Sequence, residues 1–72
     1  MKDKYKLALR RGIQRAKRAK MNQQYFLPLH EMALSNEDTH QLIFELQKRV
    51  LVKVIHLDLS TGVLLEKIGG SA

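Results

Sequence analysis

The sequence predicts a small α+β domain in which a capped amphipathic helix leads directly into a β-hairpin. Apolar residues recur at helical spacing over residues 36–49, and a strand-like run follows at 50–59. A stretch that can turn, at 60–62, separates this run from a second one that ends at Ile68. With 72 residues and no cysteine, the chain has room for one small core without a disulfide to support it. Small domains of this kind gain stability by association, so we expect a dimer.

The central helix is predicted from its cap, its charges and its apolar spacing. Ser35 can accept a hydrogen bond from the backbone N–H of Asp38, as an N-cap does. Glu37 and Asp38 lie in the first turn, and Lys48 and Arg49 lie in the last, which suits the helix dipole at both ends. We therefore expect a helix over residues 36–49 with one buried face, formed by Thr39, Leu42, Ile43, Leu46 and Val50.

The predicted hairpin turns at residues 60–62, where Gly62 can supply the left-handed conformation that a three-residue loop needs. This loop fixes the register of the strands and gathers apolar side chains on one face. The expected pairs are Leu59 with Val63, Leu57 with Leu65, and Ile55 with Lys67, with His56 opposite Glu66 on the other face.

Residues 4–21 are predicted to form a helix, within a basic amphipathic segment that covers residues 1–21. One side of this helix is weakly apolar and rich in alanine, so it can lie close against another helix. Its residues are Tyr5, Ala8, Leu9, Gly12, Ile13, Ala16 and Ala19.

The intervening segments are shorter. Residues 21–24 are polar and form a turn, and residues 25–27 are β-prone and form an edge strand. Residues 28–34 begin with a proline, which suits the first position of a helical turn or two. We thus expect a compact part over residues 25–68 and a flexible tail at 69–72.

Positive charge is concentrated at one end of the chain. Residues 1–20 hold nine Lys or Arg and one acid, a net charge of +8, whereas the remainder holds four basic and six acidic residues, a net charge of −2. A helical segment of this charge favours a polyanion such as nucleic acid, because each bound cation releases counterions from the phosphates. Its basic residues are Lys4, Lys6, Arg10, Arg11, Arg15, Lys17 and Arg18.

Three other interpretations of this segment stay open. The charge also fits a solvated face that only keeps the protein soluble. An Arg-rich amphipathic helix is typical of organellar transit peptides, although this one has no serine and carries Asp3. A helix that lies on a membrane surface would need bulkier apolar residues than the alanines found here.

No group of residues predicts catalysis. His30, His40 and His56 lack the spacing of a metal site, and no cysteine completes one. There is no glycine-rich phosphate loop at the start of a helix, and a domain this thin has little room for a substrate pocket. We expect no enzyme, no metal and no cofactor. No stretch of apolar residues is long enough to span a membrane, so we expect a cytoplasmic protein.

The order of elements over residues 25–68 resembles the winged helix-turn-helix family of DNA-binding domains. Residues 29–33 stand in the place of the family's second helix, and 34–38 in that of the turn and the start of its third. Residues 42–54 are similar to the end of that helix and the first wing strand. The resemblance implies that the third helix enters the major groove of DNA and that the wing contacts the backbone. The residues implied to face the groove are Asn36, Glu37, His40, Gln41 and Lys48.

We therefore expect a small basic regulatory or accessory protein that binds nucleic acid, with duplex DNA favoured over RNA. The expected site residues are Lys6, Arg10, Arg11, Arg15, Lys17 and Arg18 for phosphates, with His40, Gln41 and Lys48 on the central helix. The alternative is a protein-interaction module, an adaptor or inhibitor that docks on a partner protein through its hairpin and helix 36–49. The acidity of residues 36–45 favours that alternative.

Overall fold

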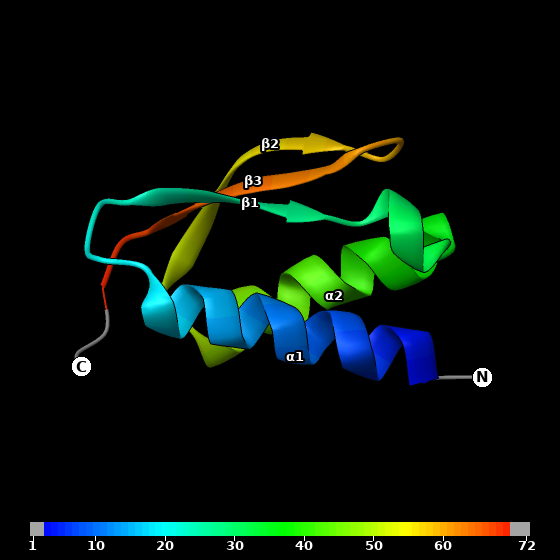
Figure 1. The fold of residues 1–72 in the computed structure, drawn as a ribbon, viewed down its shortest axis with the longest axis horizontal. Coiled ribbons are helices and arrows are strands. Elements are labelled where there is room, and N and C mark those ends of the chain that lie inside the picture. Colours follow the sequence, from blue (N-terminus) through cyan, green and yellow to red (C-terminus); the bar gives the residue numbers. More distant parts are fainter. Residues whose placement is uncertain (1–2, 70–72) are drawn as a thin grey trace.

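The computed structural model describes residues 3–69, which form a three-stranded sheet with two helices on one of its faces (Figure 1). The strands are antiparallel in the order β1-β3-β2. The predicted α+β fold class is confirmed, and β1 lies at an edge as expected. Beyond Gly69, the predicted tail lies outside the described residues. The elements are α1 (Asp3–Arg18), β1 (Gln24–Pro28), the 3-10 helix η1 (His30–Met32), α2 (Asn36–Arg49), β2 (Val52–Asp58) and β3 (Gly62–Lys67).

The core lies between the helix layer and the sheet. Its largest fully buried side chains come from β1, α2 and β3, and are Leu27, Leu42, Leu46, Val63 and Leu65. Helix α1 contributes mainly small residues, because Ala8, Gly12 and Ala16 face inward. A Cβ atom at Gly12 would lie 2.7 and 2.9 Å from the two methyl carbons of Leu46. The small residues therefore let α1 approach α2 closely, as their spacing predicts.

Helix α2 has the predicted bounds and the predicted cap. The Ser35 hydroxyl accepts the Asp38 N–H at 3.1 Å. The predicted inward face is also found, since Thr39, Leu42, Ile43 and Leu46 are buried, and Val50 is half-buried just after the helix.

Helix α1 ends at Arg18, three residues before the predicted end. Asn22 adopts a left-handed conformation with φ of 66°, and the Gln23 side chain accepts the Lys20 N–H at 2.8 Å, so residues 20–23 form a turn. Just after the helix, the Ala19 carbonyl accepts a hydrogen bond of 3.1 Å from the Lys67 ammonium. A cation at this end of a helix is favoured by the helix dipole.

The short helical turn predicted within residues 28–34 is found, but it starts at His30 and not at Pro28, because Pro28 is the last residue of β1. A proline has no N–H to donate, and an edge strand tolerates it where its nitrogen faces away from the partner strand. Within residues 28–34 the helical piece is η1, which a left-handed Ala33 ends. Leu29 and Met32 are buried, whereas Ala33 is exposed.

The predicted register of the hairpin is also wrong. Asp58 pairs with Gly62, Leu57 with Val63, and His56 with Leu64, so the loop is residues 59–61. The Asp58 side chain fixes this turn, since its Oδ1 accepts the backbone N–H of Ser60 at 2.9 Å and the Ser60 hydroxyl at 2.6 Å. Gly62 consequently lies in the strand instead of the loop, where β1 passes against it at Pro28.

A β-bulge at Ile55 adjusts β2 to the core. The register shifts between Val54 and His56, so Val52, Val54 and Leu57 all share the helix-facing side with Val63 and Leu65. Without the extra residue, Val54 and Leu57 would point to opposite faces. Ile55 and Leu59, which the predicted register places on the apolar face, are exposed instead.

The other face of the sheet carries no helix (Figure 1). Phe26, Leu64 and His56 form a row across it, and Phe26 is 44% exposed. The Phe26 ring lies over Gly62, because a Cβ at Gly62 would come within 2.7 Å of its Cζ. A second row consists of Gln24, Glu66 and Lys53, in which the Gln24 amide donates to Glu66 at 3.3 Å.

Candidate nucleic-acid interface

The basic residues of α1 are all exposed. Because each residue of a helix is rotated by about 100° from the one before, these residues form two rows along different sides of α1. The outer row consists of Lys6, Arg10 and Lys17, which line one surface pocket together with Leu9, Ile13 and Gln14. The β1-side row consists of Lys4, Arg11, Arg15 and Arg18; Arg15 reaches β1, and Lys4, at the other end of the row, lines a pocket with Ser35 and Asp38. Within residues 3–69, no acidic side chain forms an ion pair with either row.

One predicted phosphate ligand is held by the fold itself. The Arg15 guanidinium donates to the Phe26 carbonyl at 2.9 Å. The Leu29 N–H donates to the Thr61 carbonyl, so the backbone groups of Leu29 point toward β3. In an antiparallel pair the N–H and C=O groups of alternate residues point toward the partner strand, so the Phe26 carbonyl, three residues earlier, faces the free edge of β1. Arg15 therefore satisfies an edge carbonyl, whereas the outer row makes no comparable contact within the described chain.

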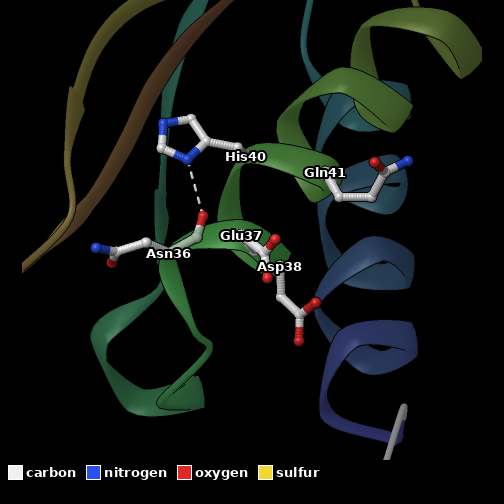
Figure 2. A pocket seen from close by; sticks show the side chains of 5 residues that line it. All are labelled: Asn36, Glu37, Asp38, His40 and Gln41. Carbon is white, nitrogen blue, oxygen red and sulfur yellow. Dashed lines mark hydrogen bonds between the residues drawn. The ribbon is translucent and has the colours of Figure 1, made fainter.

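The two base-reading candidates of α2 point to opposite sides of the helix. Figure 2 shows Gln41 directed toward α1 and His40 directed away from it. The His40 Nδ1 lies 2.8 Å from the Asn36 carbonyl, which can only accept, so Nδ1 carries the proton. The Gln41 amide donates to Glu45 at 3.3 Å. Both side chains thus already have partners on their own helix.

The pocket at the start of α2 is acidic. Its lining residues are Asn36, Glu37, Asp38, His40 and Gln41 (Figure 2). Glu37 and Asp38 favour the positive end of the helix dipole, which explains their presence without any ligand. Carboxylates here would oppose the approach of a phosphate, so this end of α2 is poorly suited to a polyanion.

A groove of about 470 Å³ separates α1 from α2 on the outer surface of the helix layer. It is lined by Tyr5, Lys6, Leu9, Gln41, Glu45 and Arg49. Glu45 is neutralised there, since the Arg49 guanidinium lies 3.2 Å from its Oε1. Burial, and secondarily the nearby Glu45, raises the pKa of Tyr5, so its phenol stays neutral at physiological pH. The groove offers an apolar floor with cations on both sides.

Lys48 contacts Phe44, an aromatic residue that is not among the site residues predicted from the sequence. Its ammonium lies 5.4 Å from the centroid of the Phe44 ring, within range of a cation–π contact. Phe44 is 56% exposed and faces outward from α2. One signal for it is present in the sequence, because an aromatic residue stands outside the apolar stripe of the helix at 44.

Of the predicted site residues, the fold brings Lys6, Arg10, Lys17, Gln41 and Lys48 to the outer surface of the helix layer. It separates Arg11, Arg15 and Arg18, which lie on the flank near β1, and His40, which points away from α1. The site is therefore divided, and its outer part spans both helices.

Comparison with protein-family models, with curated proteins and with solved structures finds no match to this chain. Over residues 3–69, neither helix is long and apolar enough to cross a membrane. In the same part of the chain, no three His, Cys, Asp or Glu side chains gather where they could hold a metal ion.

Proposed function

We propose that this protein binds nucleic acid through the outer surface of its helix layer, as a small regulatory or accessory factor. The observation that carries the proposal is the outer row, three cations on one exposed face of α1 with no ion-pair partner among residues 3–69. Unpaired cations at this spacing can each neutralise a phosphate and release a counterion. Lys48 extends the positive surface onto α2, where Arg49 is paired with Glu45.

The two rows of α1 allow a matched test. One variant carries Lys6→Gln, Arg10→Gln and Lys17→Gln in the outer row. The control carries Lys4→Gln, Arg11→Gln and Arg18→Gln in the β1-side row, and it loses the same charge. Arg15 is kept in both, because it donates to the Phe26 carbonyl.

Binding is measured by fluorescence anisotropy with labelled duplex and single-stranded oligonucleotides, at about 50 and about 200 mM salt. Each lost phosphate contact removes about 0.7–0.9 from the slope of log K against log salt, so the outer-row variant should have a slope shallower by about 2–3. The control should keep most of the affinity. Equal affinity of the two variants, both folded by circular dichroism, would refute the outer-row interface.

A second candidate function is a protein-interaction module, and the uncovered face of the sheet favours it. Phe26 and Leu64 present apolar surface there, away from the cations of α1. Binding through this face should persist at high salt and should be unaffected by the outer-row substitutions. Retention on heparin across a salt gradient, compared with a pull-down by a defined partner at physiological salt, separates the two functions.

A further inference from the structure

Phe44 is poorly explained by the fold. It exposes 56% of its surface on α2, whereas the residues that hold α2 against the sheet are Leu42, Ile43 and Leu46. Truncating such a side chain removes little buried area, so Phe44 contributes little to the core. Its position on the outer surface calls for another explanation.

Phe44 faces outward from α2, and one cation, Lys48, lies against its ring. Lys48 follows it by one helical turn, with its ammonium 5.4 Å from the ring centroid. On the neighbouring flank of α2, Gln41 and Arg49 line the groove that α2 shares with Lys6 of α1. An exposed aromatic ring and a line of cations thus lie on the same side of the helix layer.

We propose that the outer surface of the helix layer binds single-stranded nucleic acid, with one base stacked on Phe44 and the adjoining phosphates bound by the outer row and Lys48. This inference rests on the proposed function and specifies its ligand. An aromatic ring beside a positively charged groove is the combination that binds single strands, because every unpaired base offers a face for stacking. In a duplex those faces are already stacked on one another.

The acidic start of α2 also favours a single strand over the duplex that the winged-helix resemblance implies. A helix lying along a DNA groove would bring Glu37 and Asp38 close to two lines of phosphates. A flexible single strand can follow the cations of α1 and leave that end of α2 in solvent. An anionic membrane is less well matched, because the apolar residues beside the outer row, Leu9 and Ile13, are already half-buried against the core.

The test uses Phe44 variants of the whole chain and labelled oligonucleotides of thymidine and of uridine, with a duplex of equal length and vesicles containing phosphatidylglycerol as comparisons. Phe44→Ala should weaken single-strand binding about tenfold or more. Phe44→Tyr should keep the affinity because it keeps a ring, and Phe44→Leu should lose it although it keeps the apolar bulk. The chain has no tryptophan, so Phe44→Trp supplies a single emission that a stacked base should quench.

The outcomes distinguish this inference from the function on which it rests. If the outer-row variant loses binding while Phe44→Ala and Phe44→Leu bind like the native protein, the stacking inference fails and the proposed function survives. Tighter binding to the duplex, or to vesicles, also overturns it. If no oligonucleotide binds at low salt, the proposed function fails too. Loss of single-strand affinity in Phe44→Ala and Phe44→Leu, together with quenching of the Phe44→Trp emission, supports the inference. The relative affinities for the thymidine and uridine oligonucleotides show whether DNA or RNA is preferred.

Discussion

Replacing Gly62 with alanine tests how closely the strands of the sheet must approach. A Cβ atom at this position would overlap the carbonyl oxygen of Leu27 and lie 2.9 Å from the Cα of Pro28, both in the backbone of β1. It would also lie 2.7 Å from Cζ of Phe26. The Phe26 ring can rotate away from the new Cβ atom. Its overlap with the backbone of β1 is removed only if β1 moves away from β3.

The size of the effect follows from what that movement breaks. Overpacking costs about 1–3 kcal/mol. Losing the hydrogen bond from the Leu29 N–H to the Thr61 carbonyl, 3.0 Å long, costs about 1 kcal/mol more. Alanine also lowers the conformational entropy of the unfolded chain, which stabilises the folded state by about 0.4–1 kcal/mol. We expect a net loss of about 2–3 kcal/mol, which in a domain of this size lowers Tm by about 8–24 °C.

Urea and thermal unfolding followed by circular dichroism measure this loss. Gly69→Ala is the control, because its Cβ would meet only the exposed side chain of Leu51, at 3.0 Å from Cδ1. The control should change the free energy of unfolding by less than about 0.5 kcal/mol. If Gly62→Ala unfolds at the same midpoint as Gly69→Ala, the pairing of Pro28 with Gly62 is incorrect.

Three further predictions concern single side chains. Ser35→Ala removes the N-cap of α2 and should lower the free energy of unfolding by about 1 kcal/mol in urea, with Ser35→Asp retaining it. Tyr25→Phe removes a buried hydroxyl with no hydrogen-bond partner among residues 3–69, so the same measurement should show no loss, or a gain of up to about 1 kcal/mol. The Ser60 hydroxyl, followed by its N–H, lowers the pKa of Asp58, so the ionised carboxylate stabilises the turn above its ordinary pKa of 3.8 and this stabilisation is lost as pH falls through the lowered value. A side-chain NMR titration should find the Asp58 pKa below 3.8 and closer to it in Ser60→Ala, and an unchanged value would argue against this turn.

The parts of the fold that local chemistry determines could be predicted from the sequence. Helix α2 follows from Ser35 as its cap and from the spacing of its apolar residues, and both are found. The hairpin register depended on two residues that can each form a turn. Gly62 suits a loop and Asp58 suits an Asx turn, and what decides between them is the contact of Gly62 with β1, which lies far away in sequence.

The candidate site was predictable only in its charge. The sequence locates the cations in the first helix, but it does not reveal that Arg15 reaches the Phe26 carbonyl on an edge strand. The helical period alone separates the outer row from the β1-side row once the inward direction is known. That direction depends on packing against α2 and β1, which no local pattern of α1 specifies. The functional predictions, including duplex DNA and the dimer, stay predictions.

The position of β3 has a consequence for how the protein is made. This strand is central in the sheet although it comes last among the described elements, so β1 and β2 have no neighbour to pair with until it has been synthesised. Lys67, at its end, is also the residue whose ammonium reaches the Ala19 carbonyl just beyond α1. We therefore expect the sheet to form only after β3 has been synthesised, at a rate limited by closure of the long loops that separate β3 from β1 and α1.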